Sequence, residues 1–84
     1  KPADSRAAEG VRAVYRALEI LLAFGAGPSE MSALELSRRT GLSRPTLYRL
    51  MHTLEHHGFI ASIGEPQRFR LGPTVGRLGS AWMA

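Results

Sequence analysis

The sequence predicts a mainly α-helical domain that carries one small β-hairpin near its C-terminal end. Apolar residues recur at helical spacing in two segments, and a capping box opens a shorter helical segment between them. The apolar spacing then changes from helical to alternating along residues 59–71. With 84 residues, the chain can build one hydrophobic core and no second domain.

The first predicted helix begins at Val11. Residues 1–10 contain a proline and a glycine and have no apolar stripe, so we expect a flexible N-terminal tail or a frayed helix start there. Gly25–Pro28 ends the helix, because two glycines and a proline do not continue a helix without a large energetic cost. Apolar residues at i, i+4, i+7 and i+8 predict one apolar face of this helix, with further apolar residues flanking it. The predicted face is Val14, Leu18, Leu21 and Leu22, flanked by Tyr15, Ile20 and Phe24.

A short helix follows and leads into a second long one. Ser32–Glu35 has the pattern of a capping box, and Gly41 is the left-handed residue expected just after the short helix. Ser43 offers a further N-cap, and Pro45 falls in the first turn, where its missing N–H is harmless. The predicted core face of the helix 43–57 is Leu47, Leu50, Met51 and Leu54.

A β-hairpin is predicted over residues 59–71, with its turn at Gly64–Gln67. In its second half we expect Phe69 and Leu71 to face the core and Arg68 and Arg70 to face outward. Residues 73–84 open a last helix that shows no stop signal. Because the chain also begins at a residue other than Met, we expect it to be a piece of a longer protein.

The predicted order is helix, short helix, turn, helix and hairpin. This order is that of a winged helix-turn-helix, an arrangement that binds DNA. We place this domain at residues 11–72. The recognition helix, residues 43–57, is predicted to enter the major groove of double-stranded DNA. The wing, residues 59–71, is predicted to lie on the DNA backbone or in the minor groove.

The positive charge is concentrated in the same segments. The chain has 11 lysines and arginines against 7 acidic residues, a formal net charge of +4. Residues 36–54 hold four arginines and no acidic residue, and residues 66–84 hold three arginines and no acidic residue. Arginine suits phosphate groups and guanine edges. A GC-rich coding bias would give a similar composition, so the placement of the charges is the informative observation.

The exposed face of the predicted recognition helix provides the candidate DNA contacts. Arg44 is placed to bind guanine, and Thr46 to read thymine or a polar base edge. Ser43, Tyr48 and Arg49 are placed for phosphates, which fix the register without reading sequence. The complete set of predicted DNA-binding residues is Arg39, Ser43, Arg44, Pro45, Thr46, Tyr48, Arg49 and Arg68.

We expect no enzyme, no metal site and no cofactor. His52 and His56 have the i, i+4 spacing of two metal ligands, but zinc needs a third protein ligand and the chain has no cysteine. The one aspartate, Asp4, lies in the predicted tail, so a Ser-His-Asp unit has no third member. No signal-peptide pattern and no membrane-spanning run is present, which predicts a cytoplasmic protein.

Five short segments stand in order between Val14 and Gly79. They are Arg16–Leu21, Glu35–Leu42, Thr46–Leu54, Gly58–Ile60 and Phe69–Gly72. Together they resemble the N-terminal DNA-binding domain of IclR-type transcriptional regulators. The resemblance implies a homodimer on DNA through the first helix and the last helix. It also implies that residues 73–84 begin a linker to a C-terminal effector-binding domain, absent from this chain, that binds a small molecule. A two-fold dimer predicts a near-palindromic operator, with half-sites about 34 Å apart.

The chain departs from the pattern of this family at two positions. Pro45 stands where the family usually has serine, so a polar DNA contact is missing there. Ser37 stands where a small alanine is usual at a helix crossing. A winged-helix module for protein–protein contact, without DNA binding, stays open as an alternative. Its apolar contact patch would be formed by Tyr15, Phe24, Trp82 and Met83.

Overall fold

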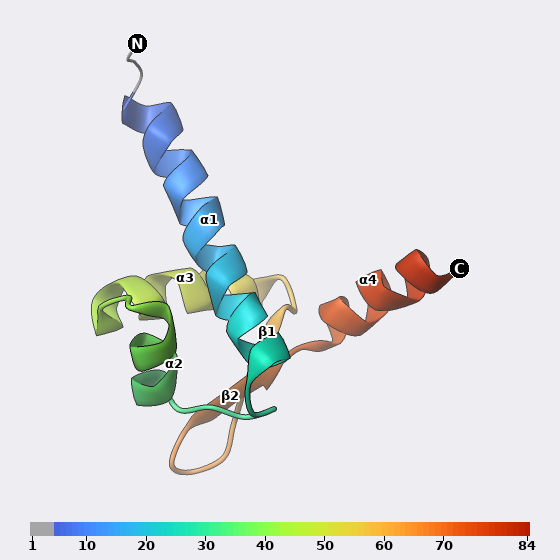
Figure 1. Ribbon diagram of the computed structural model, residues 1–84. Coiled ribbons are helices and arrows are strands. Elements are labelled where there is room, and N and C mark those ends of the chain that lie inside the picture. The colour runs from blue at the N-terminus through green and yellow to red at the C-terminus, as the bar shows by residue number, and fades with distance from the viewer. Residues whose placement is uncertain (1–4) are drawn as a thin grey trace.

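The computed structural model describes residues 5–84 of the chain. In chain order the elements are α1 (Ser5–Ala26), α2 (Ala33–Thr40), α3 (Arg44–His56), β1 (Ile60–Ile63), β2 (Arg68–Leu71) and α4 (Pro73–Met83). Figure 1 shows α1 crossing in front of α3, with α2 and the hairpin packed beside them and α4 directed away. The mainly α class with a β-hairpin wing is therefore confirmed. Residues 5–10, predicted as part of a tail, instead continue α1; residues 1–4 lie outside the described residues.

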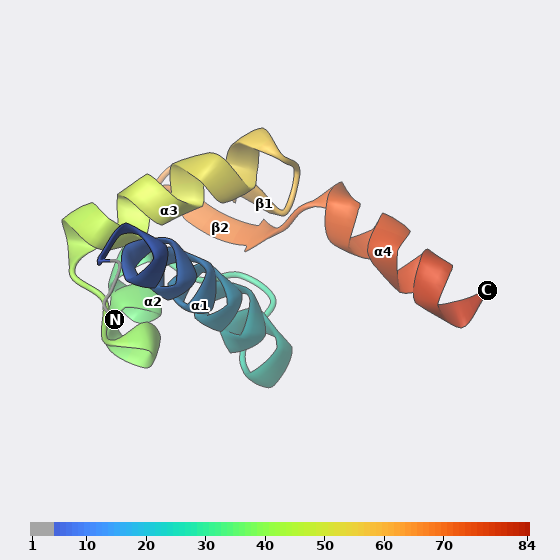
Figure 2. The same ribbon diagram turned by 90° about the horizontal axis from the view of Figure 1, so that it is seen from above.

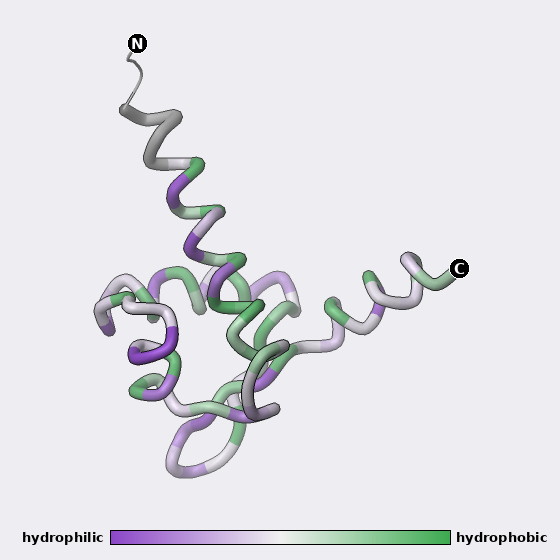
Figure 3. The backbone as a smooth tube through the Cα atoms, in the orientation of Figure 1, coloured by the Kyte–Doolittle hydropathy of each residue, from purple (hydrophilic) through white to green (hydrophobic). Residues whose placement is uncertain are grey.

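The C-terminal half of α1 enters the core mainly through the residues that flank the predicted apolar face. Ile20 and Phe24, predicted as flanking residues, are 0% and 5% exposed. Of the predicted apolar face, Leu21 packs against the core, whereas Val14, Leu18 and Leu22 are 60%, 53% and 69% exposed. Apolar spacing identifies a stripe on a helix but not the element that covers it, and α1 carries two such stripes. Figure 3 shows hydrophobic residues continuing along α1 beyond the body of the domain.

The short helix α2 and the turn after it are fixed by local hydrogen bonds. Ser32 Oγ accepts a hydrogen bond from the Glu35 N–H (3.1 Å), and Glu35 Oε1 accepts one from the Ser32 N–H (2.8 Å). Gly41 has φ 77° and ends the helix in the left-handed region. The hydroxyl of Ser37 donates to the Leu42 carbonyl (2.6 Å), which closes the turn that leads to α3. The predicted capping box and stop signal are confirmed.

The hairpin completes the core beneath α3. Leu47 and Met51 of α3 are buried, and β1 pairs antiparallel with β2 in the register Ile60↔Leu71 to Ile63↔Arg68. Met31 adds an isolated bridge to Phe69, with one N–H···O bond in each direction, at 2.9 and 2.8 Å. The buried core consists of Ile20, Phe24, Met31, Ala33, Leu36, Leu42, Leu47, Met51, Ile60 and Phe69.

α4 leaves the domain as an arm, and no residue of α4 is buried (Figure 2). Its attachment is at its first turn. The Gly72 N–H donates to the Phe59 carbonyl (2.8 Å), and the Thr74 N–H and hydroxyl donate to the Gly58 (3.0 Å) and His57 (2.7 Å) carbonyls. A Cβ at Gly72 would collide with the Gly58 carbonyl, so this junction requires glycine. Among the residues described, no helix is both long and apolar enough to cross a membrane.

Candidate nucleic-acid interface

The first two turns of α3 present a polar and basic surface opposite the buried face. The core contacts of Leu47 and Met51 fix the rotation of the helix, so Arg44, Pro45 and Arg49 are exposed on the opposite side. Six of the eight predicted DNA-binding residues lie on this segment. Five are exposed and Thr46 is half-buried; the six are Ser43, Arg44, Pro45, Thr46, Tyr48 and Arg49.

Local hydrogen bonds hold the start of this surface in place. Ser43 is the N-cap of α3, and its Oγ accepts a hydrogen bond from the Thr46 N–H (3.5 Å). The Ser43 hydroxyl in turn donates to Thr46 Oγ1 (3.1 Å). Because Thr46 accepts this bond, its own hydroxyl hydrogen remains available for a phosphate oxygen or a base acceptor. The N–H groups at the start of α3 add a favourable field for an anion.

Tyr48 lies at the junction between α3 and the hairpin. Its ring meets the ring of Phe69 edge-on, with centroids 6.5 Å apart and an interplanar angle of 64°. Phe69 is buried, whereas Tyr48 is 44% exposed. One side of the tyrosine is therefore anchored to the core while the other side remains accessible, as a positioned phosphate contact requires.

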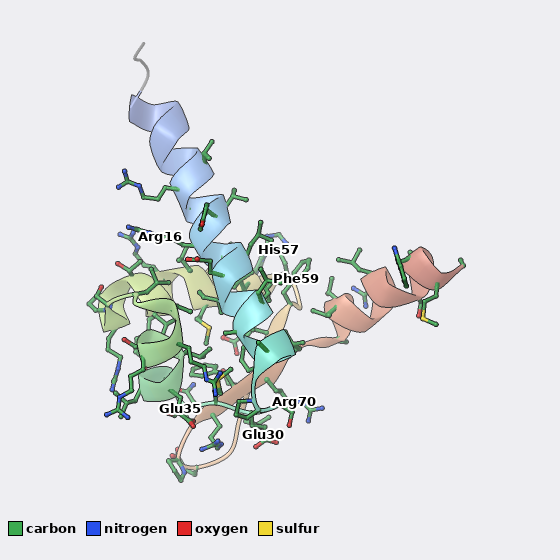
Figure 4. All side chains as sticks on the ribbon, viewed as in Figure 1. Arg16, Glu30, Glu35, His57, Phe59 and Arg70 are labelled. Carbon is green, nitrogen blue, oxygen red and sulfur yellow. The ribbon has the colours of Figure 1, made fainter. Side chains whose placement is uncertain are left out.

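The guanidinium of Arg68 is turned toward the loop before α2. Its Nη2 donates to the Glu30 carbonyl (3.1 Å), and its guanidinium lies 3.7 Å from Glu30 Oε1 and 3.5 Å from Glu35 Oε1. Arg68 lies on the strand face opposite buried Phe69, as expected, and is 41% exposed, but two acids distant in sequence hold its guanidinium. Arg70 is the exposed arginine of this strand, and Figure 4 shows it with Glu30 and Glu35 near the hairpin.

These contacts also act on the Glu35 carboxyl. The hydrogen bond from the backbone of Ser32 lowers the pKa of Glu35, and the positive charges of Arg68 and Arg39 lower that pKa further. Glu35 therefore completes the capping box of α2 and also holds the hairpin arginine.

Arg39 reaches from α2 to the C-terminal end of α1. A Cβ added at Gly27 would lie 2.6 Å from Arg39 Nη1, so the guanidinium lies directly over this glycine. A cation at the C-terminal end of a helix is stabilised by the helix dipole. This position accounts for Arg39 without DNA, and its role as a DNA contact stays a prediction.

Two arginines of α1 join the surface of α3, and the sequence analysis did not select them. Arg12 and Arg16 line a hollow of about 450 Å³ together with Thr46 and Arg49. Figure 4 shows Arg16 on the side of α1 that faces the beginning of α3. The spacing i, i+4 between Arg12 and Arg16 was the available signal, but the acids elsewhere on the segment cancel their charge.

The described residues contain no enclosed polar site. None of the buried residues is polar or charged. No group of three or more His, Cys, Asp or Glu side chains in the part of the chain that the structure describes could hold a metal ion. His56 and His57 meet edge-on, with ring centroids 5.1 Å apart. The polar chemistry of residues 10–84 is therefore on the surface.

Comparisons with known proteins agree with this geometry. Residues 13–63 match the family model described as the IclR helix-turn-helix domain. The HTH-type transcriptional regulator Rv1719 of Mycobacterium tuberculosis is 35% identical over 71 residues, which cover 84% of this chain and 27% of that protein. The HTH-type transcriptional regulator TtgV of Pseudomonas putida is 34% identical, with the same coverage of both chains.

A solved structure gives the same result for the fold. The crystal structure of an IclR family transcriptional regulator from Brucella abortus matches with a TM-score of 0.74 and 33% identity, over 83% of this chain and 27% of that chain. This chain therefore spans about a quarter of the length of the relatives that it matches.

Proposed function

Because the chain belongs to the IclR family of helix-turn-helix transcriptional regulators, we propose that it binds double-stranded DNA with α3 in the major groove. The observation that carries this proposal is the exposed basic face at the N-terminal end of α3, which begins at the Ser43 cap. In this fold the first turns of the recognition helix contact base edges. Relatives named as transcriptional regulators support the proposal.

The residues of α3 divide into base contacts and phosphate contacts. Arg44 reads a guanine through two parallel hydrogen bonds, and Thr46 contacts a thymine methyl or a polar base edge. Ser43, Tyr48 and Arg49 bind phosphates and fix the register of the helix. Pro45 contributes shape and an apolar surface, because it has no N–H to donate.

The apolar surface that the described residues leave exposed supports the proposal of a homodimer on DNA. Val14, Leu18 and Leu22 form an exposed stripe on α1, and Trp82 on α4 is 86% exposed. Stripes of this kind are covered in protein interfaces. Two copies joined through α1 and α4 would bind a near-palindromic operator with half-sites about 34 Å apart. A small-molecule effector would bind a C-terminal domain outside the sequence described here.

The experiment is a fluorescence-polarisation titration of the full 84-residue chain against duplex DNA selected by this chain from a random library. We expect Arg49→Ala to weaken binding to all duplexes alike, and Arg44→Ala to relax the preference at one base pair. Arg77→Ala on α4 is the matched control, because it removes one exposed arginine from another element. If both α3 variants bind as the wild type does, the assignment of α3 is wrong.

The alternative function is a protein–protein contact module that does not bind DNA. It predicts absent or salt-insensitive association with DNA, whereas phosphate contacts make binding fall steeply with salt. Phe24, one of the residues expected in its contact patch, is buried in the core.

A further inference from the structure

We infer that Arg12 and Arg16 of α1 form, with Arg49 of α3, a binding site for the phosphodiester backbone of DNA. This inference rests on the proposed function and extends it, because it places part of the DNA contact on the first helix. The α1–α3 hollow, lined by Gly10, Arg12, Ala13, Arg16, Thr46, Arg49 and Leu50, is the site in question.

Three arginines from two helices converge on this hollow, and none of its described lining residues is acidic. Arg12 and Arg16 are four residues apart and share one face of α1. Arg49 approaches from α3. Like charges brought together in this way repel one another, so the arrangement is unfavourable for the isolated domain unless an anion joins it.

Among residues 10–84, whose side chains the structure describes, no carboxylate forms an ion pair with this cluster. Within the described residues, both ion pairs are made by Arg68, with Glu30 and Glu35. Glu19, an acid on the same helix, lines other hollows, beside Leu22 and Tyr15. The guanidinium groups of Arg12, Arg16 and Arg49 therefore make no ion pair with a side chain of residues 10–84, which leaves them able to bind an external anion.

The position of the hollow favours DNA phosphate as that anion. Thr46 and Arg49 line the hollow and also belong to the proposed recognition surface. A phosphate in the hollow would thus belong to a strand that α3 already contacts. The guanidinium fork matches phosphate oxygens bidentately. The Cα atoms of Arg12 and Arg16 are separated by about 6 Å along the helix axis, so the pair can follow a stretch of backbone.

The net charge of residues 11–35 gives no indication of this site in the sequence. Residues 11–35 contain two arginines and three glutamates, which suggests an acidic or neutral element. Glu19 lies on the same side of α1 about two turns beyond Arg12, but it lines a different hollow, with Arg39 and Thr40, whereas Arg12 and Arg16 line the α1–α3 hollow.

The test measures binding at several salt concentrations for the wild type, Arg12→Gln, the double variant Arg12→Gln/Arg16→Gln, and Arg77→Gln as the control. The DNA probes are the library-selected duplex and a scrambled duplex of equal length. Each phosphate contact contributes about −0.9 to the slope of log K against log salt. We expect the double variant to reduce the steepness of the slope by about 1.8 and to weaken binding to both duplexes by the same factor. The control should leave the slope unchanged.

The outcomes separate this inference from the proposed function. If α3 variants weaken binding but the double variant keeps the wild-type slope, the α1 site is wrong while the proposed function stands. If the wild type binds neither duplex, both fail. Inorganic phosphate alone is the further probe. If it raises the melting temperature of the wild type and not of the double variant, while DNA binding is equal in both, the site holds a free anion and the DNA assignment is overturned. Arg12 is exposed, so its single variant keeps the test valid if the double variant does not fold.

Discussion

The left-handed residue between α2 and α3 gives a sharp stability prediction. Gly41 has φ 77°, and a Cβ built there meets nothing within 4 Å. Any loss in Gly41→Ala therefore comes from the backbone conformation and not from a collision. The left-handed region costs a residue with a Cβ about 1–2 kcal/mol. The lower entropy of the unfolded alanine chain offsets about 0.4–1 kcal/mol of that cost.

The net loss expected for Gly41→Ala is about 1 kcal/mol, which lowers the melting temperature of a domain of this size by about 4–8 °C. Gly41→Asn should lose less, because asparagine tolerates this region better. Gly25→Ala is the matched control: it also meets nothing within 4 Å, but it lies in α1. We expect Gly25→Ala to be neutral or to stabilise by up to about 1 kcal/mol.

Urea unfolding followed by circular dichroism measures these differences, with the m-value as a check that the unfolded state is unchanged. The reasoning is refuted if Gly41→Ala is as stable as the wild type. It is also refuted if asparagine and alanine lose equally, since the loss would then not depend on the left-handed conformation.

Three further predictions concern packing, pH and the hairpin. Leu47→Ala should destabilise the domain by about 2–5 kcal/mol in urea unfolding, whereas Leu22→Ala, at an exposed position, should stay within about 0.5 kcal/mol in a dilute, monomeric sample. Because folding lowers the pKa of Glu35, its stabilising contribution is complete above the ordinary glutamate pKa of about 4.3 and is lost as the pH falls through the lower folded value. Glu35→Gln should therefore flatten the acid limb of the stability–pH curve, and an unchanged limb would contradict this. Arg68→Ala should lower stability by less than about 1 kcal/mol, because its ion pairs are half-exposed, and should leave the salt slope of DNA binding as it is. Arg70→Ala should not affect stability. If Arg70→Ala lowered the stability more than Arg68→Ala, the assignment of the stabilising ion pairs to Arg68 would be wrong.

The features predicted correctly from the sequence depend on residues close together in the chain. The capping box of Ser32 and Glu35, the stop at Gly41 and the N-cap at Ser43 each involve partners within a few positions. The buried face of α3 was also predicted, because α3 has one apolar stripe and its opposite face is polar.

The features that were missed depend on partners far apart in the chain. Nothing within α1 indicates that Ile20 and Phe24, and not Val14 and Leu18, meet the rest of the domain. The bridge between Met31 and Phe69 also needs the complete fold, because an isolated loop residue has no pattern of its own. The same holds for Arg68, whose acidic partners precede it by more than thirty residues. In each case two apolar or charged groups compete for one partner, and only the packing of all elements decides between them.

The arm formed by α4 acts mechanically as a lever. Its 11 residues extend over roughly 16 Å, so a tilt of about 10° at its base displaces its far end by about 3 Å. The fulcrum is the Thr74 anchor, whose two hydrogen bonds end on the backbone of His57 and Gly58, directly after the recognition helix. With α4 as the lever arm, a force applied at Trp82 would act on the C-terminal end of α3. A displacement of the arm would therefore load the backbone at the C-terminal end of α3, the helix proposed to contact DNA.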